Sequence, residues 1–253
     1  MATKKGSNKS DRLTGGNGDD VLYGLGGNDI LDGGKGGDDD IIAGDGNDTI
    51  RGHLADNDAV DGGKGTDTLD YSREISSGYF YSDSGVGYVS AGPEIDVFKS
   101  IENFRGTKAD DIINVVNSHG GYGFGGNGAD FINVYGGVMR GDRGLDWLLG
   151  YDGTSDVFWL QRGKGEDIVY EFESGLDKIR LDGDEFHLGA MVGIYEINAT
   201  SGHAATLAKP QLLYDTNTSE LYYDDDGTGS KAAELIATFS GSNTPRWDSF
   251  EIV

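Results

Sequence analysis

Aspartates recur at nearly fixed spacing over residues 15–70 of this 253-residue chain. Each ends a six-residue phrase in which glycines stand mainly at the first, second and fourth places, as in Gly15-Gly16-Asn17-Gly18-Asp19-Asp20. The residues at the sixth place are Asp20, Asp29, Asp39, Asp48, Asp58 and Asp67. Glycine permits positive φ and close backbone approach, so the phrase can form a tight turn with inward carbonyl groups. Carboxylate and carbonyl oxygens together form the shell that Ca²⁺ prefers over the smaller Mg²⁺.

The elements that position these aspartates are strands too short to fold alone. An apolar residue stands two places after each aspartate: Leu22, Leu31, Ile41, Ile50, Val60 and Leu69. The period is nine residues, with one insertion at Gly33 and a worn copy over 53–61 that has lost its glycines. A sustained nonapeptide period is typical of a calcium-binding parallel β-helix, in which a turn stacks on the next but one. A flexible Gly/Asp-rich linker is disfavoured, because it would not keep the apolar residue in phase.

The phrase resembles GGxGxDxUx, the repeat of the RTX, or haemolysin-type, calcium-binding proteins. In that family the earlier turn of a stacked pair gives its second and fourth carbonyls and its Asp, and the later turn gives its first and third carbonyls and its Asp. The resemblance implies one site made by Gly16, Gly18, Asp20, Gly34, Gly36 and Asp39. It implies a second made by Leu25, Gly27, Asp29, Ala43, Asp45 and Asp48. Two further pairings would join Asp39 to Asp58 and Asp48 to Asp67.

A second, degenerate roll is expected over residues 106–160. Residues 106–114 keep Asp111, residues 125–133 form a full copy around Asp130, and residues 141–149 keep Asp146. One or two more calcium sites are expected there, joining Asp111 to Asp130 or Asp130 to Asp146.

The remaining segments complete an all-β, right-handed parallel β-roll with an antiparallel C-terminal cap. The expected parts are a basic lead (1–14), the first roll (15–70), an aromatic hairpin insert (71–105), the second roll (106–160) and a β cap (161–253). The cap resembles that of serralysin-type secreted proteins, which implies an uncleaved signal for a type I secretion apparatus. The tyrosines of the insert either stack on sugars or cover an apolar edge of the coil, and the second reading is favoured.

The net charge of the chain limits the kinds of partner that it can bind. The chain has 44 acidic and 20 basic residues, a formal net charge of −24, and no cysteine. Such an excess argues against nucleic acid or an anionic membrane and for cations. Without metal the stacked carboxylates would repel one another, so the roll is expected to be disordered until it binds calcium. No apolar segment follows the lysines of residues 1–10, and no stretch is long enough to span a membrane, so export without an N-terminal signal peptide to the extracellular space is expected.

Enzymatic activity has no positive support in the sequence. The histidines His53, His119, His187 and His203 do not form the His-Glu-x-x-His of the serralysin proteases, and there is no GxSxG elbow. The predicted role is a calcium-binding extracellular protein that acts as matrix, surface or adhesive material. The starting Met, the lysine-rich lead and the tail favour this reading. The alternatives are an auxiliary module that binds acidic polysaccharide, like the repeat modules of alginate epimerases, and a cryptic carbohydrate-active enzyme.

Overall fold

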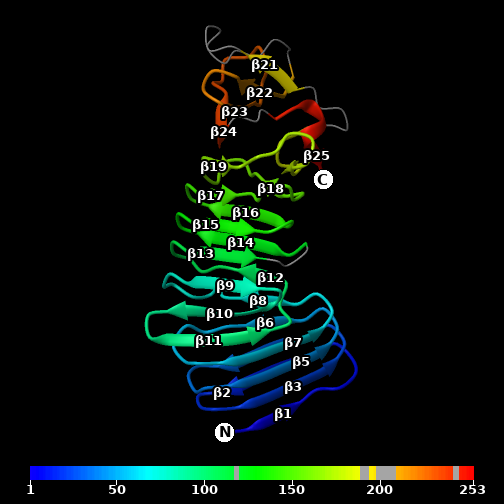
Figure 1. Cartoon of the computed structure of the whole chain (residues 1–253), viewed down its shortest axis with the longest axis vertical. Coiled ribbons are helices and arrows are strands. Elements are labelled where there is room, and N and C mark those ends of the chain that lie inside the picture. The colour runs from blue at the N-terminus through cyan, green and yellow to red at the C-terminus, as the bar shows by residue number, and fades with distance from the viewer. Residues whose placement is uncertain (117–119, 189–193, 198–208, 242–244) are drawn as a thin grey trace.

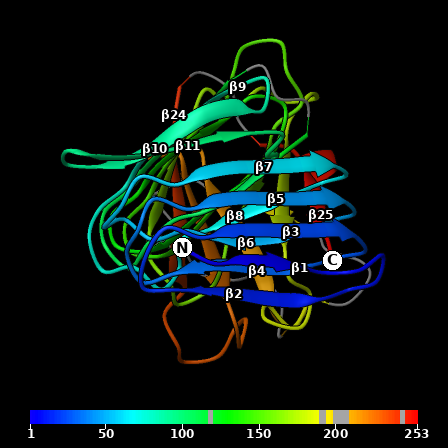
Figure 2. The same cartoon turned by 90° about the horizontal axis from the view of Figure 1, so that it is seen from below.

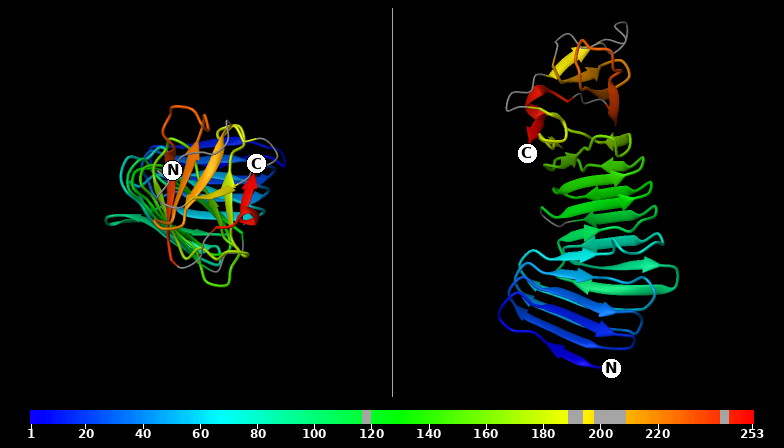
Figure 3. Two further views of the ribbon diagram at one scale, coloured as in Figure 1. Left: turned by 90° about the horizontal axis from the view of Figure 1, so that it is seen from above. Right: turned by 180° about the vertical axis from the view of Figure 1, so that it is seen from behind.

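A computed structural model describes residues 1–116, 120–188, 194–197, 209–241 and 245–253. The chain winds as a β-solenoid, with the N-terminus at one end and the C-terminal strands towards the other (Figure 1). Figure 2 looks along the coil from its N-terminal end, and Figure 3 shows the same stack from above and from behind. His119 and His203 lie outside the described residues.

Two sheets run the length of the coil. The first has 15 strands in the following spatial order: β1 (Thr3–Lys5), β3 (Val21–Gly26), β5 (Asp40–Asp45), β7 (Ala59–Lys64), β11 (Glu94–Lys99), β10 (Val86–Ala91), β9 (Tyr79–Asp83), β13 (Ile112–Val116), β15 (Phe131–Val134), β17 (Trp147–Leu149), β19 (Asp167–Tyr170), β24 (Glu234–Ser240), β23 (Glu220–Asp224), β22 (Gln211–Asp215) and β21 (Ile194–Ile197). The second has ten strands: β2 (Arg12–Gly16), β4 (Ile30–Gly34), β6 (Thr49–Arg51), β8 (Thr68–Asp70), β12 (Asn103–Arg105), β14 (Tyr122–Asn127), β16 (Val138–Arg143), β18 (Val157–Trp159), β20 (Lys178–Leu181) and β25 (Phe250–Ile252).

The apolar residue of each repeat forms the core between the sheets. Leu22, Ile41 and Val60 face one another in register on β3, β5 and β7. Leu31, Ile50 and Leu69 do the same on β4, β6 and β8. All six are buried, as the period predicts. Each such burial stabilises the fold by about 1.5–3 kcal/mol.

The insert enters the first sheet. β11 pairs parallel to β7, β10 runs antiparallel to both β11 and β9, and β9 pairs parallel to β13. Phe80, Val89 and Phe98 point inward and are buried, so the apolar core passes through the insert without a break.

The C-terminal end departs from the parallel pattern. β24 pairs parallel to β19, and β23 then pairs antiparallel to both β24 and β22. The 3₁₀ turn η2 (Trp247–Ser249) leads into β25, which closes the second sheet. The predicted all-β parallel roll with antiparallel strands at its C-terminal end is therefore confirmed. Within the described residues, no helix has the length and apolarity needed to cross a membrane.

Candidate metal centre

The glycine phrases form the turns that join the two sheets. In the copies that begin at Ala43 and Gly62, the residue at the second place takes a left-handed backbone, with φ of 114° at Gly44 and 98° at Gly63. Leu25 occupies the same place with φ of 81°, a conformation that side chains rarely adopt. The preference for glycine at this place therefore follows from the shape of the turn.

The sixth-place aspartates stack in two columns, one on each side of the coil. In Asp39, Asp48, Asp58 and Asp67, Oδ1 accepts the backbone N–H of the aspartate in the turn below. The donor to acceptor distances are 2.7 Å for Asp20 to Asp39, 2.7 Å for Asp29 to Asp48, 2.8 Å for Asp39 to Asp58 and 2.8 Å for Asp48 to Asp67. All four pairs named from the sequence are thus brought together, although the copy over 53–61 has lost its glycines.

In three of these aspartates, the second carboxylate oxygen accepts no hydrogen bond. Oδ2 of Asp29, Asp48 and Asp67 is buried and has no hydrogen-bond partner. An unpartnered buried carboxylate oxygen is costly unless a cation or a donor meets it. The donor set, two carboxylates and backbone carbonyls, suits Ca²⁺.

The first-place glycine forms one wall of this oxygen cradle. A Cβ added at Gly24 would lie 2.4 Å from Asp29 Oδ2 and 2.3 Å from the Ala43 carbonyl oxygen. At Gly125 the same atom would lie 2.2 Å from Asp130 Oδ2 and 2.7 Å from the Gly141 carbonyl oxygen. The carboxylate and the carbonyl of the next turn therefore converge on a space that any side chain at the first place would fill.

The strand register places the inserted residue of the first predicted site differently from the sequence-based prediction. Gly16 pairs with Gly34, whereas Asp20 stacks on Asp39, so the extra residue lies in the turn after Gly34 and not at Gly33. A Cβ at Gly15 would meet the Gly33 carbonyl oxygen at 1.8 Å, as Gly24 meets Ala43. Gly33 therefore takes the first place, which the repeat pattern had predicted for Gly34. Lys35 and Gly36 share the third place, because Gly37 stacks on Gly18.

The second predicted site keeps the register that the repeat implies. Leu25 lies beside Gly44 and Gly26 beside Asp45. A Cβ at Gly46 would lie 2.0 Å from the Gly27 carbonyl oxygen, so the fourth places also stack. Ala43 and Asp45 accordingly hold the first and third places above Asp29.

Burial disfavours the ionised form of these carboxyls and so raises their pKa values. It raises the pKa of Asp39 and of Asp67 to about 6, against the lowering effect of the N–H groups that they accept. It raises the pKa of Asp58 to about 8, with the neighbouring Asp56 and Asp96 adding to the rise. Each such group favours a divalent cation, which would restore the ionised form.

In the second roll, both of the alternative pairings are present. The N–H of Asp111 donates to Asp130 Oδ1 and that of Asp130 donates to Asp146 Oδ1, each at 2.8 Å. Oδ2 of Asp130 and of Asp146 is buried without a partner. Asp111 instead accepts from the Gly78 and Thr107 N–H groups. The pair of Asp130 and Asp146 therefore resembles the turns of the first roll more closely.

Four aspartates outside the named set continue the stacking. Asp96 accepts the N–H of Asp58 at 2.8 Å, and Asp177 accepts that of Asp156 at 2.9 Å. Asp167 lies against Asp146, and burial raises the pKa of Asp167 well above its ordinary value. Three of them lack the glycine phrase, whereas Asp167 ends a phrase with glycines at its second and fourth places, Gly163 and Gly165. Each of the four precedes an apolar residue by two places, and that shorter pattern could have revealed them.

Stacked turns with buried, unpartnered carboxylates on a parallel β-solenoid define a calcium-binding β-roll. Residues 5–39 and 34–69 match the family model of the RTX calcium-binding nonapeptide repeat. The first roll therefore consists of RTX repeats, which bind calcium ions. No curated protein matches the chain. Among solved structures the chain is similar to the extracellular lipase LipA from Serratia marcescens, with 15% identity and a TM-score of 0.30. That similarity covers 97% of this chain but only 38% of the lipase.

Proposed function

We propose that this chain is a secreted, non-enzymatic protein whose β-roll folds when it binds calcium outside the cell. The observation that carries the proposal is the set of buried Oδ2 atoms without partners on Asp29, Asp48 and Asp67. A fold that aligns these oxygens with carbonyl groups of the next turn is poorly stabilised until a cation joins them.

The proposed sites lie between stacked turns. In the first roll they pair Asp20 with Asp39, Asp29 with Asp48, Asp39 with Asp58 and Asp48 with Asp67. In the second roll the site pairs Asp130 with Asp146. The carbonyls of the intervening turn residues complete each shell, as the repeat pattern implies.

The stabilisation expected from calcium is large enough to act as a folding switch. A site with Kd of ~0.1 mM gains about 1.4 kcal/mol at millimolar calcium. Several such sites reach the scale of a whole domain's stability, roughly 5–15 kcal/mol. At submicromolar cytosolic calcium the gain vanishes, which suits a chain that is exported unfolded through a type I apparatus and folds on arrival.

Calcium-coupled folding can be tested by far-UV circular dichroism of the purified chain, titrated with CaCl₂ and in parallel with MgCl₂. The expected result is β signal that appears cooperatively with calcium and not with magnesium. A chain already folded in EDTA and unchanged by calcium would contradict the proposal. Recovery of the folded chain in the culture medium of a host with a type I exporter, and not of a host without one, tests export separately.

A second candidate function is binding of acidic polysaccharide. Tyr79, Tyr81 and Tyr88 lie on the outer face of β9 and β10, while Phe80 and Val89 fill the core. The Tyr88 ring centroid is 6.0 Å from that of Tyr79 and 5.7 Å from that of Tyr81, and Tyr88 is 36% exposed. Exposed aromatic faces of this kind can stack on sugar rings, but the net charge of −24 requires calcium to bridge to an acidic chain.

Affinity electrophoresis in alginate gels tests this candidate. A Tyr88→Ala variant should migrate faster than the unaltered chain when both calcium and alginate are present. Equal mobility of the two chains would argue against a sugar-binding role for the tyrosine face. Tyr23→Ala on β3, a comparably exposed tyrosine (37%) outside the insert, is the matched control.

A further inference from the structure

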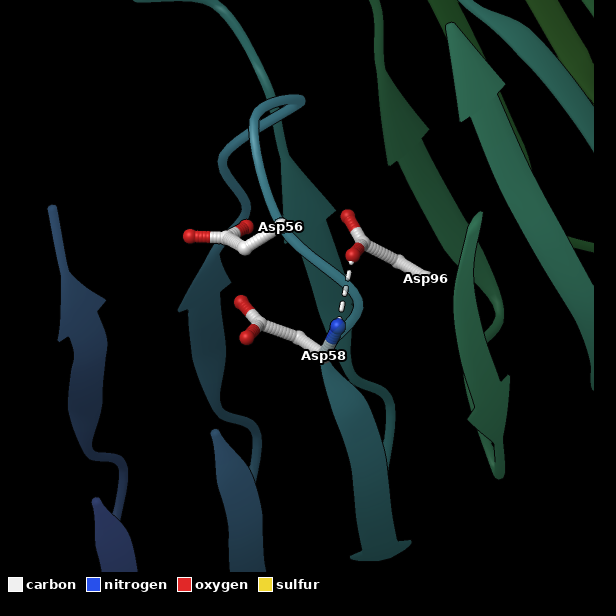
Figure 4. A group of neighbouring side chains, drawn as sticks. All are labelled: Asp56, Asp58 and Asp96. Atoms are coloured by element: carbon white, nitrogen blue, oxygen red, sulfur yellow. Dashed lines mark hydrogen bonds between the residues drawn. The ribbon is translucent and has the colours of Figure 1, made fainter. Parts of the chain in front are cut away.

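Three aspartates meet where the first roll joins the insert. Asp56 and Asp58 lie on the segment that leads from β6 into β7, and Asp96 lies on β11 beside them (Figure 4). One carboxylate oxygen from each lies within 4.8 Å of the others. Asp56 is 5% exposed, and Asp58 and Asp96 are each 2% exposed, so three acidic groups share one buried space.

Two of the three carboxylates are held in place by hydrogen bonds. Asp96 Oδ1 accepts the N–H of Asp58 at 2.8 Å, and the Tyr71 hydroxyl donates to Asp96 Oδ2. Asp58 Oδ1 accepts the N–H of Asp39 at 2.8 Å. These bonds fix the orientation of both side chains.

Asp56 differs, because neither of its oxygens has a hydrogen-bond partner although both are buried. Burial raises the pKa of Asp56, against smaller lowering effects of His53 and of the Gly36 N–H, which does not reach hydrogen-bonding geometry. A carboxylate placed this way is costly unless a cation meets it.

The basic side chains of this region are engaged elsewhere. His53 contacts Asp32 through Nε2 and Glu74 through Nδ1, each at 3.2 Å. Arg51 and Arg73 also face Asp32. Among the residues that the structure describes, no lysine, arginine or histidine forms an ion pair with any member of the trio.

We propose that Asp56, Asp58 and Asp96 together bind one further Ca²⁺ that ties the insert to the first roll. The site does not follow the nonapeptide pattern, because the copy over 53–61 has no glycine phrase and the third carboxylate comes from β11. Ca²⁺ takes six to eight oxygens, so backbone carbonyls and water would complete the shell. Three carboxylates would bind a hard divalent cation more tightly than the two that a stacked pair of repeat turns supplies, since ligand charge tunes affinity.

The ion would hold β11 of the insert against β7 of the first roll. β11 pairs with β7 through only three register positions, from Val97 with Ala59 to Lys99 with Asp61. Because β10 and β9 follow β11 in the sheet, anchoring Asp96 to Asp56 and Asp58 holds the whole insert against the first roll.

The number of calcium ions per full-length chain, measured by atomic emission after removal of free ion, tests the proposal. Asp56→Asn is the informative variant, because Asp56 makes no hydrogen bond that the amide would break. It should bind one ion fewer than the unaltered chain. Asp38→Asn, which removes an exposed charge near Asp56, is the matched control and should lose none. An unchanged count in Asp56→Asn would overturn the proposal, while repeats that bind no calcium in the unaltered chain would instead refute the repeat sites.

Terbium luminescence provides a second readout that leaves all three carboxylates in place. Tb³⁺ replaces Ca²⁺ in oxygen sites, and the Tyr71 ring beside Asp96 would sensitise an ion bound there. Tyr71→Phe should lower the tyrosine-excited Tb³⁺ emission while the calcium count stays the same. Emission equal to that of the unaltered chain would overturn the proposal, even if the Asp56 variant failed to fold.

Discussion

In five of the stacked aspartates the two carboxylate oxygens have different roles: Asp29, Asp48, Asp67, Asp130 and Asp146. In Asp29, Oδ1 accepts the N–H of Asp11 at 2.7 Å, which orients the carboxylate, and Oδ2 is buried without a partner. The hydrogen bond therefore holds the carboxylate in place, and the unpartnered oxygen remains available to bind a cation. Neighbouring glycines keep the space beside it open.

Adding one methyl group at the first place should close a site. Gly24→Ala would put a Cβ 2.4 Å from Asp29 Oδ2, whereas the Cβ of Gly18→Ala would meet nothing within 4 Å. We expect the first variant to lose about 1–3 kcal/mol and to fold at higher calcium, because overpacking displaces the ligand oxygens. Calcium titrations followed by circular dichroism provide the comparison. Equal midpoints for the two variants would show that the cradle is not a site.

Asp39 should matter more than Asp67. Asp39 stacks on Asp20 below and on Asp58 above, so two proposed sites share it. Asp67 stacks on Asp48 and is followed by Glu102, which has no glycine phrase. We expect Asp39→Ala to raise the calcium midpoint of folding more than Asp67→Ala does. The same midpoint in both variants would count against the shared position of Asp39.

At the scale of strands, an outer ladder of arginines and aromatic rings supports the second sheet. Arg140 on β16 lies 4.2 Å from the Phe124 ring centroid and 4.9 Å from that of Trp159. Arg105 and Arg180 extend the ladder, at 5.7 Å from Phe124 and 5.5 Å from Trp159. Cation–π contacts of this kind stabilise by roughly 0.5–2 kcal/mol, depending on desolvation.

Removing the central arginine tests this ladder. Arg140→Gln should lower the free energy of unfolding by about 1 kcal/mol, while Arg143→Gln, exposed on the same strand, should change it by less than about 0.5 kcal/mol. Urea unfolding in saturating calcium measures both. The ladder would be unimportant if the two variants unfolded alike.

Strand register explains which features the sequence could predict. The buried positions of Leu22 and Ile41, and the pairing of Asp29 with Asp48, follow from the period alone. The insertion near Gly33 could not be placed, because it depends on which carbonyls pair between β2 and β4. The pairing of Asp58 with Asp96 was also missed, since it spans an insert whose third strand, β11, replaces a repeat turn.

At the scale of the whole molecule, net charge and burial oppose each other. A chain of charge −24 buries a column of carboxyls, and burial raises the pKa of Asp111 to about 6 and of Asp130 to about 8. Without calcium, the folded chain lowers the cost of burying these carboxyls by binding protons.

The pH dependence without calcium should therefore have an unusual sign. A carboxyl whose pKa is raised on folding binds more protons in the folded state between its ordinary pKa of 3.8 and its raised value. The free energy of unfolding then falls as pH rises through that window. We expect β structure without divalent ions to increase as pH is lowered from about 8 to about 5. With calcium the trend should reverse, because the ions need ionised carboxylates. The same trend in both conditions would contradict this account.

Calcium held between stacked aspartate turns is the central claim. Anomalous diffraction at long wavelength, from crystals grown with calcium, locates such ions directly. We predict anomalous peaks between the turns that carry Asp20 and Asp39 and between those that carry Asp29 and Asp48, with another beside Asp56. A well-ordered roll with no anomalous peak between these turns would contradict the account.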